Sequence, residues 1–225
     1  MSSGVRMASY YPQYSSSGLP PRQSPPPSNV STMGTVTIVL ALCLTAVYVA
    51  QGVAGYLAGD QYAAAARQGR PALDVATWAD ALVVVQVPLL IGAYAATCVW
   101  LYRARANAQI LSPHLHHRRS PAWVWLGWWM PVVSAWFPYQ VVRDVRSGSI
   151  RNRPPQAFLG LWWLSFLVLI TMDRVVARLT SSTAPLTQQR ADHLAPVHLV
   201  FAAVALIAGM LWVGVVAEIT DNQTK

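Results

Sequence analysis

Charged residues are scarce in this sequence of 225 residues. Asp, Glu, Lys and Arg together make up 11% of the chain, whereas a soluble domain carries about a quarter. The chain has a single lysine and two cysteines, Cys43 and Cys98, and both cysteines lie within apolar stretches. Two such cysteines exclude a disulfide framework and a four-cysteine zinc site. The shortage of charge excludes an ordinary soluble domain.

Recurrent catalytic and cofactor-binding patterns are also missing. The sequence contains no GxxxxGK[ST], GxGxxG, HExxH or GxSxG motif. Its apolar stretches carry no acidic or basic residue near their centres, where proton and ion pathways usually place one. We therefore expect a protein that is not an enzyme, that uses no cofactor, and that is not an ion-coupled pump.

Long apolar stretches dominate instead, and residues of the AVILMFWYC set make up 54% of the chain. A stretch of about twenty such residues is long enough to cross about 30 Å of hydrocarbon as a helix. We expect an all-α, polytopic membrane helical bundle at residues 33–217, with four or five of its apolar helical segments spanning the bilayer. The five segments are residues 33–58, 81–102, 121–142, 156–172 and 195–216.

The two ends of the chain differ from this domain. Residues 1–32 contain six prolines and nine serines. So few apolar residues predict a disordered leader, which either solubilises the chain or offers its prolines to a protein partner. Residues 218–225 are expected to form a short polar tail. The first apolar segment ends with small residues spaced by four, namely Ala50, Ala54 and Ala58, and Gly55 with Gly59. This spacing favours close helix packing within the protein.

The central block, residues 100–149, joins a basic helix to a tryptophan-rich stretch. Arg103 and Asn107 are four residues apart, and Trp100 extends the same helix face. We expect this helix to be amphipathic, with Arg103 and Arg105 at the level of the lipid phosphates. A basic loop follows, and its histidines His114, His116 and His117 are a weak candidate for a metal site. No cysteine or acid lies nearby to complete such a site, so we expect no metal and a solvated loop.

Residues 121–142 contain five tryptophans and three prolines, Pro121, Pro131 and Pro138. Trp128 lies in a predicted tryptophan stripe, and the inner prolines would break or kink a helix. The segment is either a kinked span or a re-entrant or interfacial segment. If it spans, Lys and Arg divide nine to seven between the two sides; if it stays on one side, they divide eleven to five. The positive-inside rule prefers the second arrangement, with a cytoplasmic N-terminus.

Arg143 and Asp144 follow this segment directly. Asp144 is the only acid among eight arginines between residues 100 and 153. We therefore expect an ion pair from Asp144 to Arg103 or Arg105, which would join the two halves of the central block.

Several residues of this block carry a resemblance to a known family. They are Trp100, Arg103, Asn107, Ala108, Ser120, Pro121, Trp128, Pro131, Pro138, Tyr139, Val142 and Asp144. Over residues 33–216 the chain resembles the bacterial membrane proteins called domain of unknown function 4328. The resemblance implies several apolar helices and often a proline-rich cytoplasmic leader. It implies no activity, because none is assigned to the family.

Two functions are compatible with these features. The first is a non-enzymatic structural or interaction component of the inner (cytoplasmic) membrane, which presents basic segments 103–119 and 143–153 to anionic lipid headgroups or to a partner. The second is a small-solute channel or transporter subunit, in which the tryptophan- and proline-rich segment lines a cavity. The basic residues are spread over short loops, so we expect no nucleic-acid partner.

Overall fold

The computed structural model describes residues 27–150 and 157–225, and most of these residues are helical. The helices, in chain order, are α1 (Ser31–Leu57), α2 (Gly59–Arg67), η1 (Ala72–Asp74), η2 (Trp78–Ala81), α3 (Leu82–Leu111), α4 (Trp123–Leu126), η3 (Val133–Ala135), α5 (Phe137–Ser149), α6 (Ala157–Thr180) and α7 (Gln188–Thr224). No β-strand forms within these ranges. The predicted all-α bundle is confirmed.

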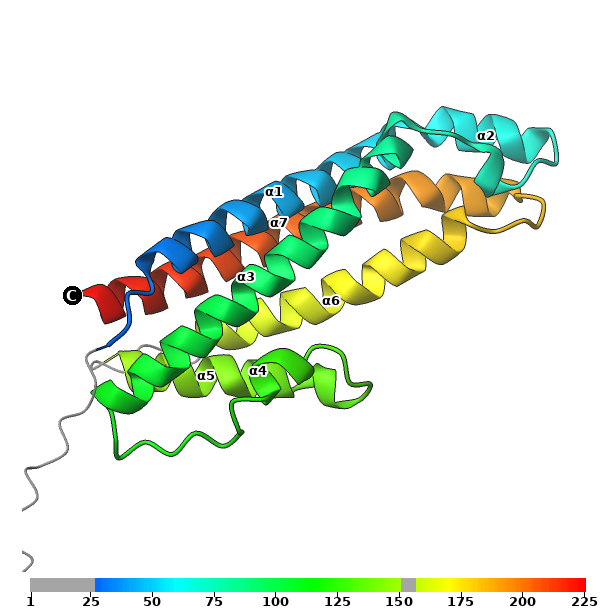
Figure 1. Cartoon of the computed structure of the whole chain (residues 1–225). Coiled ribbons are helices and arrows are strands. Elements are labelled where there is room, and N and C mark those ends of the chain that lie inside the picture. Colours follow the sequence, from blue (N-terminus) through cyan, green and yellow to red (C-terminus); the bar gives the residue numbers. More distant parts are fainter. Residues whose placement is uncertain (1–26, 151–156) are drawn as a thin grey trace, which may run out of the picture.

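Four helices are long and apolar enough to cross a membrane: α1, α3 together with η2, α6 and α7. They lie side by side in an elongated bundle (Figure 1), in which α7 packs along both α1 and α6, and α3 packs against α1. The start of α1 and the end of α7 lie at one end of this bundle, which we call the C-terminal end. Helix α2 lies at the opposite end (Figure 1). These four apolar helices indicate a membrane protein.

Several helices continue beyond the predicted apolar segments. Helix α3 ends at Leu111, so the basic helix predicted after residue 102 is its direct continuation. Helix α6 reaches Thr180 rather than residue 172, and α7 extends in both directions and includes the predicted polar tail up to Thr224. A helix continues past an apolar stretch wherever backbone hydrogen bonds and packing still stabilise it. Of the predicted leader, residues 1–26 lie outside the described residues, and α1 begins at Ser31.

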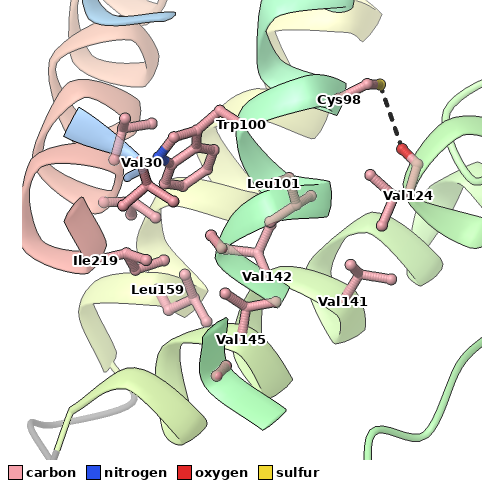
Figure 2. Packing of buried hydrophobic residues seen from close by; sticks show 14 of the residues in the cluster. Val30, Cys98, Trp100, Leu101, Val124, Val141, Val142, Val145, Leu159 and Ile219 are labelled. Carbon is pink, nitrogen blue, oxygen red and sulfur yellow. Dashed lines mark hydrogen bonds between the residues drawn. The ribbon is translucent and has the colours of Figure 1, made fainter. Parts of the chain in front are cut away.

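The larger cluster of buried apolar residues joins α3, α5, α6 and α7, and Figure 2 shows its packing. Trp100 of α3 is fully buried there, and its indole Nε1 donates a hydrogen bond to Thr220 Oγ1 of α7 at 3.0 Å. Val142 of α5, Leu159 of α6 and Ile219 of α7 complete the cluster around it. Trp100, which the sequence placed on an amphipathic surface, is therefore a core residue that links α3 to α7.

Small residues let α1 and α7 approach closely. Gly52 and Gly55 of α1 face His198 and Ala202 of α7. A Cβ atom on Gly52 would lie 2.8 Å from the carbonyl oxygen of His198 and 2.9 Å from the backbone nitrogen of Ala202. Ala54 and Ala58 are buried as well, so the small-residue packing face predicted in this segment is confirmed.

Candidate functional site: a tryptophan-rich hairpin and a polar junction

The tryptophan- and proline-rich segment forms a hairpin that returns to the end of the bundle from which it starts (Figure 1). Its first helix, α4, lies beside the middle of α3, where the Tyr94 hydroxyl donates a hydrogen bond to the Trp125 carbonyl at 2.8 Å. Its second helix, α5, ends beside the end of α3, where Ser112 Oγ donates to the Gly148 carbonyl at 3.0 Å. We call residues 121–149 the interfacial hairpin. This arrangement corresponds to the re-entrant or interfacial alternative.

The three prolines lie at the turns of the hairpin. Pro138 lies in the first turn of α5, where a missing backbone N–H costs no hydrogen bond. Pro121 lies in the turn before α4, and Pro131 precedes Val132, whose φ of 67° and ψ of −55° reverse the chain. The backbone N–H of Val133 donates to the Pro131 carbonyl at 2.7 Å, which closes a γ-turn. The single helix on which the tryptophans were predicted to form a stripe is therefore absent from residues 121–142.

Aromatic side chains hold the hairpin against the bundle on one face and leave the other face uncovered. Trp128 packs edge-on against Trp163 and Phe166 of α6, with ring centroids 6.4 and 5.9 Å apart. Trp163 Nε1 donates to the Ala135 carbonyl at 2.9 Å. On the outer face, Trp129 is 70% exposed and Val132 is 72% exposed. Uncovered apolar side chains of this size mark a surface that contacts lipid or a partner.

The predicted ion pair of Asp144 is wrong. Asp144 Oδ2 accepts a hydrogen bond from the backbone N–H of Arg118 at 2.8 Å, and Oδ1 lies 3.8 Å from the guanidinium of Arg143. Within the described ranges, no ion pair joins Asp144 to Arg103 or Arg105. The loop after α3 folds back over α5 and brings a backbone donor to the carboxylate. Asp144 therefore fastens the basic loop to α5.

The basic loop buries one histidine and leaves two exposed. His117 is half-buried, whereas His114 and His116 are exposed. Burial lowers the pKa of His117, the nearby Arg105 charge lowers it further, and the Asp144 carboxylate raises it in part. His117 is therefore neutral at pH 7. No group of three or more His, Cys, Asp or Glu side chains is placed to hold a metal ion in the part of the chain that the structure describes.

Asn107 is the centre of a polar junction that joins four parts of the chain. Its side chain is 1% exposed. Its Oδ1 accepts from the backbone N–H of Ser28 at 2.8 Å, and its Nδ2 donates to the Ser28 carbonyl at 2.7 Å and to Gln223 Oε1 at 3.2 Å. Gln223 Nε2 in turn donates to the Ala104 carbonyl at 2.8 Å and to Ser149 Oγ at 2.6 Å. The segment before α1 is thereby tied to α3, α5 and α7.

A buried ion pair lies beside this junction. Arg146 of α5 is 4% exposed, and its Nε and one Nη donate to the two carboxylate oxygens of Glu218 on α7 at 2.7 and 2.9 Å. Such two-pronged pairing is the strongest geometry for arginine and carboxylate. Sequence reasoning missed this pair because it assigned Glu218 to a separate polar tail, whereas α7 continues through it. Glu218 is the first charged residue after the last apolar segment, and that was the available signal.

The remaining sequence candidates lie at the surface of the same end. Arg103 is exposed on α3, and Arg143 is half-buried on α5 with its guanidinium 5.7 Å from the Tyr139 ring centroid. The structure thus brings Asn107, Arg143 and Asp144 to one end of the bundle.

These features define an α-helical membrane protein that carries a tryptophan-rich interfacial hairpin on a bundle of four apolar helices. Residues 65–221 match the sequence model described as domain of unknown function (DUF4328), and the chain belongs to this family. The matched residues begin within α2. Helix α1, which the resemblance noted in the sequence had included, therefore lies outside the match. No curated protein matches the chain, and no solved structure matches it.

Proposed function

We propose that this protein is a non-enzymatic structural or interaction component of the cytoplasmic membrane. Its C-terminal end faces the cytoplasm, and the interfacial hairpin with its flanking arginines binds anionic lipid headgroups there. The observation that carries the proposal is the hairpin itself, whose outer face exposes Trp129 and Val132 and whose second helix holds the basic loop, with Arg119 packed over the Phe137 ring at 3.6 Å. Stable membrane-surface binding usually combines apolar insertion with basic charge.

The distribution of charge supports this orientation. A hairpin that stays on one side supports four spans. Of the described basic residues, seven then lie at the C-terminal end and five at the opposite end: Arg103, Arg105, Arg118, Arg119, Arg143, Arg146 and Lys225 against Arg67, Arg70, Arg174, Arg178 and Arg190. An excess of basic residues marks the cytoplasmic side of a membrane protein.

The arginines near the hairpin differ in how exposed their guanidinium groups are to a lipid headgroup. Arg119 is held over the Phe137 ring at 3.6 Å, and its Nε donates to Gln140 at 2.8 Å. Arg103 and Arg118 are exposed. Arg143 is half-buried on α5, and its guanidinium lies 3.8 Å from the Asp144 carboxylate. Arg103, Arg118 and Arg143 are therefore the cations that we assign to phosphate contact. The negative surface potential of an anionic leaflet attracts each of them.

Lipid selectivity tests this assignment. We expect the protein in vesicles to prefer spin-labelled phosphatidylglycerol over phosphatidylcholine, and we expect Arg103→Gln, Arg118→Gln and Arg143→Gln together to lower that preference about threefold or more. Electron paramagnetic resonance measures the motionally restricted lipid. The matched control removes three arginines, Arg67, Arg70 and Arg190, from the opposite end. Equal loss in both triple variants contradicts a specific role for the hairpin end.

Cysteine labelling in intact cells tests the orientation. In a chain with Cys43→Ala and Cys98→Ala, we expect single cysteines at Ser120 and Ser147 to stay unlabelled by a membrane-impermeant maleimide until the cells are opened. A cysteine at Gln68, which is exposed at the opposite end, labels from outside and serves as the control. Labelling of Ser147→Cys from outside, with Ser120→Cys protected, would show that the segment crosses the membrane.

A small-solute channel or transporter subunit is the second candidate function. The cavity of about 410 Å³ in the structure lies at the end opposite to the hairpin, and no hairpin residue lines it. It therefore gives no support to transport through a cavity lined by the tryptophan- and proline-rich segment.

A further inference from the structure

A cavity of about 410 Å³ lies at the end of the bundle away from the hairpin. Residues of α1, α2, α3, α6 and α7 line it, together with the segment between α2 and α3. Its volume lies within the range of about 300–1,000 Å³ that is typical of small-molecule sites. The cavity is separate from the hairpin, so an inference about it does not depend on the lipid-binding proposal.

The charge that lines this cavity is negative. Asp80 and Asp173 are the only charged side chains among the lining residues. Asp80 Oδ2 already accepts the backbone N–H of Thr77 at 2.5 Å and caps η2. Asp173 makes no hydrogen bond and no ion pair with any described residue, and its neighbour Arg174 acts on it only electrostatically. The free carboxylate is thus that of Asp173.

The position of Asp173 makes this free carboxylate unusual. Helix α6 begins at Ala157, so at 1.5 Å per residue Asp173 lies about 24 Å along the helix. This is close to the full hydrocarbon thickness of about 30 Å, so Asp173 lies where α6 leaves its apolar stretch. Acidic residues in membrane helices normally pair with a cation or serve a bound ligand. Within the described ranges no cation forms an ion pair with Asp173, and a ligand can.

Two buried polar groups in the cavity wall have hydrogen-bonding capacity left over. Tyr62 of α2 is 3% exposed, and its hydroxyl has no hydrogen-bond partner among the described residues. His198 of α7 is 5% exposed, and its Nδ1 bonds the Leu194 carbonyl at 2.8 Å. That bond assigns the proton to Nδ1 and leaves Nε2 as an acceptor. The two rings stack with centroids 6.1 Å apart and an interplanar angle of 16°.

We propose that this cavity binds a primary ammonium group carried on a short apolar chain. An ammonium group has three donors and no acceptor, and the wall offers it the unpaired Asp173 carboxylate, while Tyr62 and His198 line the same cavity. The carboxylates of Asp80 and Asp173 would repel an anionic ligand. A bare metal ion lacks its ligand set, because no three metal-ligating side chains gather within the described residues.

The ammonium group can come from a soluble amine or from an ethanolamine lipid headgroup. The cavity lies where α1, α3, α6 and α7 leave their apolar stretches, and Gln51 Nε2 of α1 donates there to Gln86 Oε1 of α3 at 2.7 Å. Both sources share the chemistry that the wall recognises. The experiment below separates them.

The test uses the full chain in nanodiscs of phosphatidylcholine and phosphatidylglycerol, with n-butylammonium as the probe. Calorimetric titration is expected to show saturable binding, and Asp173→Asn is expected to weaken it about tenfold or more, as loss of a charge-assisted contact does. The matched control is Asp192→Asn, because Asp192 is exposed on α7, bonds the Gln188 side chain at 3.0 Å and lies outside the cavity. It should leave the affinity unchanged.

A neutral probe, a cavity-filling variant and a lipid competition complete the experiment. Neutral n-butanol should not bind, and Ala177→Phe, which fills the cavity and keeps both acids, should abolish binding even if Asp173→Asn fails to fold. Competition by phosphatidylethanolamine in the disc identifies the lipid headgroup as the source, and its absence identifies a soluble amine. The proposal is overturned if n-butylammonium does not saturate, if n-butanol binds equally well, or if Asp173→Asn and Asp192→Asn behave alike.

Discussion

Glu218→Gln is expected to lower the free energy of unfolding by about 2–3 kcal/mol, because it removes the carboxylate that faces buried Arg146. Breaking a fully buried ion pair costs about 3–5 kcal/mol. Because the Glu218 side chain is 28% exposed, we expect a loss of stability at or below the lower end of that range. The measurement is denaturant unfolding in mixed micelles, followed by tryptophan fluorescence. Arg146→Lys, which keeps the charge but cannot bind both oxygens, should cost less.

Asp221→Asn is the matched control for this prediction. Asp221 lies one turn further along α7 and is exposed, so its replacement should change stability by no more than about 0.5 kcal/mol. Equal effects of Glu218→Gln and Asp221→Asn would mean that the pair between α5 and α7 contributes nothing beyond a surface charge. The hairpin would then be held by its aromatic contacts and by its hydrogen bonds to α3, α6 and α7.

Gly52→Ala is expected to lower the free energy of unfolding by about 1–3 kcal/mol, as overpacking of a close contact does. The added methyl would meet backbone atoms of His198 and Ala202, and backbone cannot move aside as a side chain can. The helices α1 and α7 must separate to accept it. Thermal or denaturant unfolding of the purified protein measures the loss.

Gly160→Ala should have the opposite sign. Gly160 lies inside α6, and a Cβ atom there would meet nothing within 4 Å. Alanine has the higher helix propensity, so this change should raise stability by up to about 1 kcal/mol. If both substitutions shift stability in the same direction, the close contact of α1 with α7 is not what decides the effect at Gly52.

Much of the fold was predictable because it depends on local properties. Apolar length predicted where the long helices lie, since burial of a helix in hydrocarbon needs only a continuous run of apolar residues. The small residues around Gly55 predicted close packing, and Pro131 and Pro138 predicted breaks. These inferences succeeded because hydropathy, side-chain size and a missing N–H act within a few residues of chain.

The candidate site was predictable only in part. Asn107 and Asp144 were singled out correctly as unusual polar residues of the central block, but their partners were not. Asn107 bonds Ser28 and Gln223, which are 79 and 116 residues away in the chain. Asp144 bonds the backbone of Arg118. A hydrogen bond depends on positions to within a few tenths of an ångström, and spacing along a sequence does not specify such distances.

The sequence by itself determined that this is a helical membrane protein, where its apolar segments lie, and where its tryptophan-rich segment must break. Only the tertiary structure decided that this segment turns back as a hairpin, that Arg146 meets Glu218, and that Tyr62, Asp173 and His198 share one cavity. The physical reason is that helix formation and apolar burial are properties of short stretches. The meeting of buried polar groups depends on how separate helices pack against one another.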